Sequence, residues 1–212
     1  GYVPTPISFK GAKPKCDIFC AGGDLKASFG LLKKNDVYLS QYFGDLENYE
    51  VFERYKWNYN HMCGLFNISP KVVVTDIHPQ YFSTRFAEKL NLKQIKVQHH
   101  HAHIASVMAE NNMDSEVIGI AFDGTGYGDD GCIWGGEVLI CGKTDYRRIG
   151  HLSYTKMCGG DNSSKDASLS ALCYLHSCGI EDCSEEKYRI IKSTLDNDIN
   201  THLSSSFGRL FD

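Results

Sequence analysis

The sequence has no excess of positive charge. Its 22 Lys and Arg residues are outnumbered by 26 Asp and Glu residues, which gives a formal net charge of -4 at pH 7. Because nucleic-acid binding depends on clustered positive charge, we expect no nucleic-acid partner. The apolar runs are too short to span a membrane, and the N-terminus lacks a signal-peptide pattern. We therefore expect a cytoplasmic protein with no membrane partner.

Paired cysteines are also missing. The chain has nine cysteines, but no two of them form a Cys-x-x-Cys motif. A zinc ribbon is therefore not indicated, and the scattered, odd-numbered set gives no disulfide framework. We expect reduced cysteines that pack as small apolar side chains, which fits a reducing cytosol.

No standard nucleotide-binding motif is present. The glycine-rich loop expected after the apolar run 117–122 reads Asp123-Gly124-Thr125-Gly126-Tyr127-Gly128, which fits neither the Walker pattern nor the dinucleotide-binding fingerprint. Its glycines would let the backbone approach an anion, and Thr125 would add a hydroxyl donor. A plain hairpin turn would have a similar composition. The loop therefore predicts phosphate binding only together with its neighbours.

A second glycine turn lies near the N-terminus, at Gly22-Gly23-Asp24. Lys26 follows this turn closely, so it is a candidate phosphate contact. Exposed lysines are common on protein surfaces, and an ordinary solvated lysine explains the position equally well.

Four histidines within five positions are the most informative feature of the sequence. They lie in the segment VQHHHAHIASVMAE, where His99 and His103 are four residues apart. In a helix this spacing places both imidazoles on one face, where they can share a divalent zinc or iron ion. A carboxylate commonly completes such a site, and Asp123 at the end of an apolar run is the candidate. The apolar stripe expected to face the core consists of Ile104, Val107 and Met108.

The remaining pair, His100 and His101, is left for a catalytic or substrate-side role. A single histidine is usually structural, but four clustered histidines are a different case. The cluster lies in mid-chain, is interrupted by Ala102 and opens an amphipathic helix, so it is not an expression tag. The cluster therefore predicts a metal or catalytic site.

The first part of the chain follows a clear order of elements. Residues 1–15 are rich in Pro, Gly and Lys and are expected to form a leader or linker. We then expect an antiparallel meander, followed by a helix with Asp45 as its N-cap and a buried aromatic stripe. The elements expected for this half, in the order βββαβαβα, are strands 16–21, 28–33 and 36–42, a helix from residue 46 to about residue 66, strand 71–75, helix 81–90, strand 94–98 and the histidine helix.

The second part starts in the same way, with three strands expected at 116–122, 132–141 and 146–154. Gly159-Gly160-Asp161 then leads into helices expected at 167–176 and 184–199. A repeated βββαβαβα half is the plan of the α/β actin-like kinase and sugar-kinase (ASKHA) fold. We therefore expect a first half at 16–115 and a second, truncated half at 116–212, as a fragment of a longer protein.

Several blocks of sequence resemble one family along nearly the whole chain. The blocks are GYVPTPI, GGDLKASFGLLKKNDVYLSQYFGDLENYE, DIHPQYFSTRFAEKL, VQHHHAHIASVMAE, VIGIAFDGTGYGDDGCIWGGE and SSSFGRLFD. In this order they closely resemble the transferase domain of the hydrogenase maturation carbamoyltransferases of the HypF family.

The resemblance implies a specific reaction. In HypF-like proteins an upstream YrdC-like domain converts carbamoyl phosphate and ATP to carbamoyl adenylate, and the domain resembled here transfers the carbamoyl group to the C-terminal cysteine of HypE. The resemblance implies that His99, His103 and Asp123 hold the metal. It also implies that the adenylate lies against the loop Gly124, Thr125 and Gly126, against Gly160 and Asp161, and near Lys26.

Two alternatives remain open. One is another adenylate-using enzyme of the same fold, such as an O-carbamoyltransferase or a threonylcarbamoyl-adenosine tRNA enzyme, although the acidic balance disfavours tRNA. The other is a non-catalytic interaction module. The family usually continues after Gly159-Gly160-Asp161 with an Arg, an acid and a Pro-Trp pair, whereas this chain has Asn162-Ser163-Ser164-Lys165-Asp166-Ala167-Ser168. We expect the isolated fragment to be inactive.

Overall fold

The computed structural model describes residues 4–8, 14–160, 166–180 and 186–211. The chain divides into two compact units. Unit 1 comprises Gly1–Gln98 and Met108–Met113, and unit 2 comprises His99–Val107 and Asp114–Asp212. Within the described ranges, no helix has both the length and the apolar character needed to cross a membrane.

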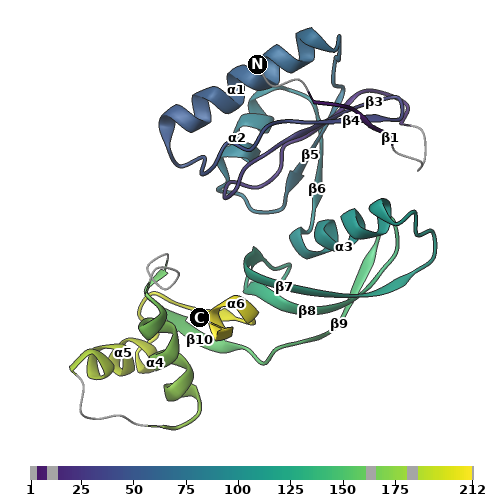
Figure 1. Cartoon of the computed structure of the whole chain (residues 1–212). Helices are drawn as coiled ribbons and strands as arrows, with labels where there is room; N and C mark the ends of the chain where they lie inside the picture. Colours follow the sequence, from purple (N-terminus) through teal and green to yellow (C-terminus); the bar gives the residue numbers. More distant parts are fainter. Residues whose placement is uncertain (1–3, 9–13, 161–165, 181–185, 212) are drawn as a thin grey trace. The chain divides into compact units, whose positions relative to one another are not determined.

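A six-stranded sheet forms the centre of unit 1 (Figure 1). Its strands are β1 (Ile7–Ser8), β2 (Ile18–Cys20), β3 (Gly30–Lys33), β4 (Asp36–Leu39), β5 (Val72–Asp76) and β6 (Lys93–Val97). They are arranged in the order β1-β4-β3-β2-β5-β6. The antiparallel pairs β2/β3 and β3/β4 confirm the predicted meander, while β5 and β6 join in parallel. Part of the expected leader pairs with β4 as strand β1.

The helices of unit 1 are α1 (Tyr49–Leu65) and α2 (Phe82–Lys89), and helix α3 (His99–Glu110) is divided between the two units. From β2 to α3 the elements follow the predicted order βββαβαβα. Helices α1 and α2 pack together through aromatic edges, such as Tyr55 against Phe86 with ring centroids 5.9 Å apart. Both helices belong to one hydrophobic core with Phe19 and Val73 of the sheet.

The start of α1 differs from the prediction. Asn48, not Asp45, is the N-cap, because its side-chain oxygen accepts hydrogen bonds from the amides of Glu50 and Val51. Asp45 instead accepts from the Glu47 amide and closes the turn that precedes the helix. Asp and Asn are both favoured caps, so composition alone does not choose between them.

The aromatic stripe of α1 is largely buried, as predicted. Tyr55, Tyr59 and Met62 are all less than 10% exposed, and the Tyr55 hydroxyl donates a hydrogen bond of 2.6 Å to the Ala21 carbonyl. Tyr49 is the exception, with 74% of its surface exposed, because it lies at the first position of the helix.

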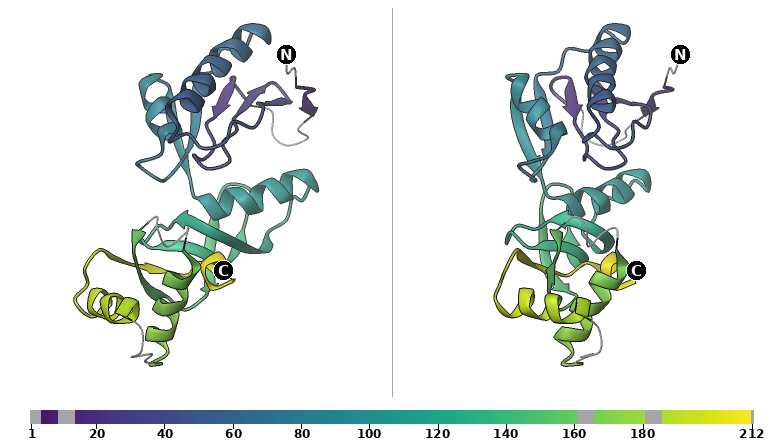
Figure 2. Two further views of the ribbon diagram at one scale, coloured as in Figure 1. Left: turned by 60° about the vertical axis from the view of Figure 1, so that its left-hand side comes forward. Right: turned by 90° about the vertical axis from the view of Figure 1, so that its left-hand side faces the viewer.

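Unit 2 contains a five-stranded sheet (Figure 2). Its strands are β7 (Val117–Tyr127), β8 (Ile133–Cys141), β9 (Tyr146–His151), β10 (Thr155–Cys158) and β11 (Thr201–Ser204). The order is β10-β11-β8-β7, and β9 also pairs with β8. Strands β7, β8 and β9 confirm the three predicted strands, whereas β10 and β11 are additional.

Besides most of α3, the described residues of unit 2 form the helices α4 (Ala167–Ser177), α5 (Glu186–Asp196) and α6 (Phe207–Phe211). Helices α4 and α5 lie within one residue or inside the predicted ranges, but α6 was not predicted. Asp166 caps α4 by accepting from the Ser168 amide. A second hydrophobic core joins α4 and α5 to β10, through residues such as Leu172, Tyr188 and Met157.

The cysteines of the described ranges are free thiols, as expected. Only Cys141, Cys158 and Cys173 are fully buried, and Cys178 is exposed. The expectation that they pack as small apolar side chains therefore holds for three of them.

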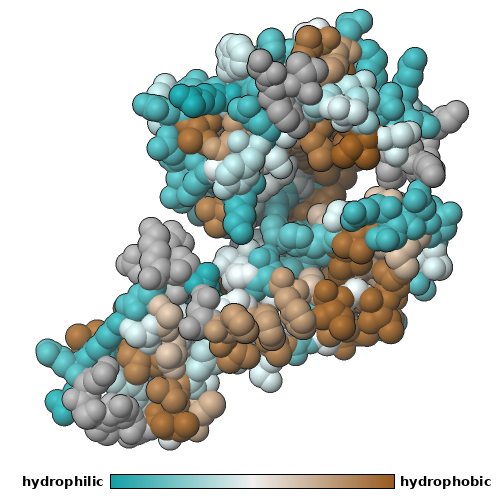
Figure 3. Space-filling model, viewed as in Figure 1, coloured by the Kyte–Doolittle hydropathy of each residue, from teal (hydrophilic) through white to brown (hydrophobic). Residues whose placement is uncertain are grey.

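The pleat of β7 gives it two different faces. Successive strand residues point to opposite sides of a sheet, so alternate residues share a face. The side chains of one face are 60–70% exposed, and hydrophobic side chains gather over strands β7 to β9 in Figure 3. These exposed side chains are Ile118, Ile120 and Phe122. The other face bears Gly119, Ala121 and Asp123.

Candidate functional site

The start of α3 and strand β7 bring together the three residues predicted to bind metal. The Nε2 atom of His99 lies 3.1 Å from Oδ2 of Asp123, and Nε2 of His103 lies 3.9 Å from the same oxygen. The two Nε2 atoms are themselves 3.1 Å apart. Such a convergence of two imidazoles and a carboxylate is characteristic of a transition-metal site.

Two features of local structure produce this convergence. The four-residue spacing of His99 and His103 places both rings on the same side of α3. The pleat of β7 turns Asp123 toward the helix, together with Gly119, where a Cβ would collide with Ile104. In the predicted apolar stripe Ile104 and Met108 are buried, but Val107 is 54% exposed, so its assignment to the core was wrong.

Asp123 is held in its charged form. Its Oδ1 atom accepts a hydrogen bond of 2.6 Å from the Gly124 amide, which leaves Oδ2 toward the histidines. Burial acts to raise the pKa of Asp123, but the hydrogen bond and charge of His99 outweigh it and lower the pKa to about 2. The side chain is therefore a carboxylate at neutral pH.

The other two histidines are buried. His100 is fully enclosed, with its Nε2 atom 3.7 Å from Oδ2 of Asp123 and its ring beside Trp134. Burial, aided by the charge of His99, lowers the pKa of His100 to about 4, so it is neutral at pH 7. The Nε2 atom of His101 lies 3.1 Å from the Gly142 carbonyl oxygen. The catalytic role of these two residues stays a prediction.

The three converging side chains fit a divalent ion. One nitrogen or oxygen from each of His99, His103 and Asp123 lies within 4.8 Å of the others. Neutral imidazole and carboxylate are ligands that both zinc and iron accept. The exposed fractions of the side chains, 22% for His99 and 58% for His103, leave the cluster open to solvent on one side.

The segment predicted as a glycine loop is not a loop. Strand β7 continues to Tyr127, and its pairing with β8 is only interrupted by a register shift between Phe122 and Gly126. A Cβ atom at Gly126 would lie 3.1 Å from His99 Cδ2 and closer still to the ring of His100. Glycine is therefore needed at position 126 to accommodate the histidine rings. Thr125 is exposed.

For the other residues predicted to contact the adenylate, the structure gives their exposure and backbone conformation. Lys26 is an exposed residue of unit 1 with a positive φ of 51°. Gly160, in unit 2, also has a positive φ, of 52°, and a Cβ there would meet open space. Asp161 lies outside the described residues. The adenylate contacts of these residues stay predictions.

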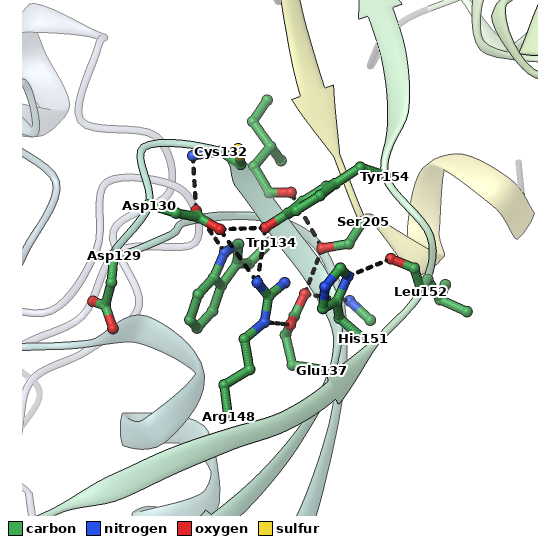
Figure 4. A network of polar contacts seen from close by, with 12 residues as sticks. Asp129, Asp130, Cys132, Trp134, Glu137, Arg148, His151, Leu152, Tyr154 and Ser205 are labelled. Atoms are coloured by element: carbon green, nitrogen blue, oxygen red, sulfur yellow. Dashed lines mark hydrogen bonds and ion pairs between the residues drawn. The ribbon is translucent and has the colours of Figure 1, made fainter.

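A buried charge network beneath the cluster was not predicted from the sequence (Figure 4). Glu137 of β8 is fully buried, and its Oε2 atom accepts a hydrogen bond of 2.6 Å from Arg148 Nε. Its Oε1 atom accepts from Ser205 Oγ at 2.5 Å and from the Gly135 amide at 3.2 Å. The network therefore joins strands β8 and β9 to the Ser204–Ser206 segment. Alternation along β8 was a signal that would have found Glu137, since it occupies a core-facing position.

The same network reaches the histidines through Trp134. The Arg148 guanidinium lies 3.9 Å from the centre of the Trp134 ring and also donates to Asp130 and Tyr154. Asp130 accepts a hydrogen bond of 2.9 Å from the Trp134 indole. The indole is thus held by a cation over its face and a hydrogen bond at its edge, and it packs beside His100.

The strand and helix order of unit 1, together with the histidine and aspartate cluster, defines a Kae1-like domain of the actin-like class. Two family descriptions match the chain in succession: the HypF Kae1-like domain at residues 13–110, and the second subdomain of the carbamoyltransferase Kae1-like domain at residues 119–212. The chain belongs to the HypF family.

Individual relatives agree with this assignment. Carbamoyltransferase HypF of Synechocystis sp. and carbamoyltransferase HypF2 of Cupriavidus necator are both 36% identical to the whole chain, which spans 31% and 27% of their lengths. A solved structure of full-length HypF in a phosphate- and nucleotide-bound form superposes with a TM-score of 0.92 at 40% identity, over 99% of this chain and 29% of that one. The structure of T. kodakarensis HypF gives a TM-score of 0.85 at 34% identity, with 99% and 30% covered. The chain therefore spans about three-tenths of these proteins.

Proposed function

We propose that this chain provides the carbamoyl-transfer site of a HypF-type carbamoyltransferase. The observation that carries the proposal is the convergence of His99, His103 and Asp123 in a chain of this family. Relatives named carbamoyltransferase, and a solved relative described as phosphate- and nucleotide-bound, support a carbamoyl donor that contains a phosphate.

The reaction is the transfer of a carbamoyl group from carbamoyl adenylate, made from carbamoyl phosphate and ATP on a YrdC-like domain, to the C-terminal cysteine of HypE. The cysteine thiolate attacks the carbonyl carbon, a carbon–sulfur bond forms, and the bond from the carbonyl carbon to the phosphate oxygen breaks. The products are S-carbamoyl-cysteine and AMP, and the proton of the thiol is released to a base. Stabilising the oxyanion that forms on the carbonyl oxygen is the main demand on the site.

His99, His103 and Asp123 would hold a divalent zinc or iron ion, which supplies Lewis-acid stabilisation of a carbonyl or phosphate oxygen. The lowered pKa of Asp123 keeps this ligand ionised at neutral pH. His100 stays neutral because its pKa is about 4, so it does not add a positive charge that would repel the ion. Gly126 lets the rings of His99 and His100 lie close against β7.

The test is the metal content of the purified chain after dialysis, measured by elemental analysis. We expect near-stoichiometric zinc or iron in the wild-type chain and its loss in the His99→Ala/His103→Ala variant. The control is His151→Ala, which removes an exposed histidine of the same unit. Metal that remains in the double variant contradicts the proposed ligands.

A second assay tests the transfer itself. The enzyme is a longer protein that contains this chain, and it is supplied with carbamoyl adenylate and HypE. Mass spectrometry then follows carbamoylation of the C-terminal cysteine of HypE. We expect transfer by the wild type and at least a hundredfold loss in His103→Ala. Equal rates in both proteins would rule out a role for the cluster, and a wild type that binds metal without transfer would favour a non-catalytic module.

A further inference from the structure

The short helix α6 is fastened to β7 beside the cluster. The Ser206 hydroxyl donates a hydrogen bond of 2.7 Å to the Gly124 carbonyl and accepts one of 3.0 Å from the Arg209 amide. Tyr174 of α4 adds a hydroxyl hydrogen bond of 3.3 Å to the Ser206 carbonyl. Ser206 and Tyr174 therefore hold the start of α6, and with it Arg209, against Gly124.

The backbones of α6 and β7 are in direct contact. A Cβ atom at Gly208 would lie 2.7 Å from the Cα atom of Gly124, so only glycine permits this approach. The charge network described above supports the arrangement from below, because Glu137 holds Ser205 through a hydrogen bond of 2.5 Å. Ser204, Ser205 and Ser206 are each no more than 1% exposed.

This contact brings the Arg209 guanidinium next to Gly124 of β7. Its Nη2 atom lies 3.7 Å from the place where a Cβ of Gly124 would be, and Gly124 directly follows Asp123. This separation is an ordinary van der Waals distance, so the guanidinium lies over this part of β7. Arg209 is only partly exposed.

We propose that Arg209 binds the phosphate of the substrate beside the His99, His103 and Asp123 cluster. A guanidinium is permanently charged, and its planar set of N–H donors matches two oxygens of a phosphate. The ligand class is an organic phosphate such as a nucleoside monophosphate or an acyl adenylate, and the identification of that phosphate with the adenylate rests on the proposed function. In this role Arg209 orients the phosphate side of the bond that breaks.

The test compares AMP with adenosine, which lacks only the phosphate, by isothermal titration calorimetry of the full chain loaded with zinc. In Arg209→Gln we expect AMP affinity to fall about tenfold or more, since a hydrogen bond to a charged group is lost, while adenosine affinity changes less than twofold. Arg209→Lys keeps the charge but loses the paired donors, so we expect a smaller loss.

Two further variants keep the test decisive. Arg147→Gln removes an exposed arginine of the same unit and should leave AMP affinity unchanged. Ser206→Ala removes the hydroxyl that fixes α6 to Gly124 and should weaken AMP binding less than Arg209→Gln. Equal AMP affinity in Arg209→Gln and wild type, equal losses for AMP and adenosine, or a wild type without preference for AMP would each overturn the proposal. Loss of AMP affinity without carbamoyl transfer by any variant would instead overturn the proposed function alone.

Discussion

Each unit contains an aspartate beside glycines, Asp24 shortly after β2 and Asp123 within β7, but the two carboxylates have different partners. In unit 1, Asp24 is 6% exposed, and its two oxygens accept hydrogen bonds of 2.6 and 3.0 Å from the amides of Phe82 and Ser83 at the start of α2. In unit 2, Asp123 uses one oxygen for the Gly124 amide and directs the other toward histidine rings.

The difference lies in the helix that faces the carboxylate. Helix α2 offers backbone amides that have no partner within the helix, so Asp24 acts as a cap. Helix α3 offers imidazoles, so Asp123 becomes part of the proposed metal site. An aspartate beside glycines at a strand therefore does not by itself identify a functional site, and the chemistry of the opposing helix decides its role.

The interiors of the two units also differ, one being aromatic and the other partly charged. Unit 1 is centred on packed aromatic rings, among them Phe19, Tyr59 and Phe86. The part of unit 2 around β8 encloses the ion pair of Glu137 and Arg148. We expect the stability of unit 1 to fall most when a buried side chain loses volume. The stability of this part of unit 2 should fall when a buried charge is removed.

The largest expected effect is that of Phe19→Ala in unit 1. Phe19 is fully buried and contacts Phe29, Tyr59 and Phe86. Loss of this ring should lower the free energy of unfolding by about 4 kcal/mol, through lost burial and the cavity left behind. Urea denaturation followed by circular dichroism measures the change.

Phe19→Leu is the control, and it should cost clearly less because it keeps most of the volume. Hydrogen exchange should rise in β2 and β5, which pair with one another, and not in β8. Equal losses for Ala and Leu would contradict the importance of packing at this position.

Glu137→Ala is expected to have the next largest effect. The change leaves Arg148 partly buried without its carboxylate and removes the acceptor for Ser205 and Gly135. We expect a loss of about 3 kcal/mol, because breaking the buried pair leaves Arg148 with only the more exposed carboxylate of Asp130. The two tryptophans of the chain, Trp57 and Trp134, lie in different units. Fluorescence of Trp134 in a Trp57→Phe background therefore reports on unit 2.

The contribution of Glu137 to the stability of the protein should also depend on pH. Burial acts to raise its pKa, but hydrogen bonds from Arg148, Ser205 and the Gly135 amide outweigh burial and lower the pKa below 4.5. Since the folded pKa is the lower one, the stabilisation is present above pH 4.5 and is lost as the pH falls through the lowered value. Urea denaturation of Glu137→Gln at pH 7 and at pH 3 should give a smaller pH dependence than in wild type. An unchanged pH dependence would mean that Glu137 does not carry it.

Asp24→Ala should have a moderate effect. It removes both acceptors for the amides of Phe82 and Ser83, and loss of a helix cap costs about 1 kcal/mol. The metal content should not change. Asp123→Ala is the matched variant of unit 2, in which metal content should fall. A variant of Asp24 that loses metal as well would erase the distinction between the two aspartates.

Periodic patterns in the sequence were sufficient to predict most of the strands and helices. The alternating and helical patterns predicted the strands and helices from β2 to β9, and the four-residue spacing of His99 and His103 predicted their convergence. Strands β10 and β11 and helix α6 were not predicted. Strands β10 and β11 pair with one another across α4 and α5, so no hairpin turn marks them as one marks the equally short β3 and β4.

Long-range contacts limited the prediction of the site. The capping of α2 by Asp24 joins residues 58 and 59 positions apart, and the contact of Ser205 with Glu137 spans 68 positions. Gly126 lies in a segment with the composition of a phosphate-binding loop. In the structure, however, the rings of His99 and His100 pack against Gly126, at the register shift of β7. The local sequence does not indicate which distant residues will become neighbours in the fold.

The smallest expected effect concerns the two faces of β7. Ile120 is 60% exposed, whereas its neighbour Ala121 is 6% exposed on the face toward α3. We expect Ile120→Thr to change the free energy of unfolding by no more than about 0.5 kcal/mol, since it keeps a β-branched side chain at an exposed position. Ala121→Thr should cost about 1–3 kcal/mol, because it adds atoms and a hydroxyl to a packed face. Urea denaturation followed by Trp134 fluorescence compares the two variants. If Ile120→Thr were the more costly change, the outer face of β7 would have to be covered in solution.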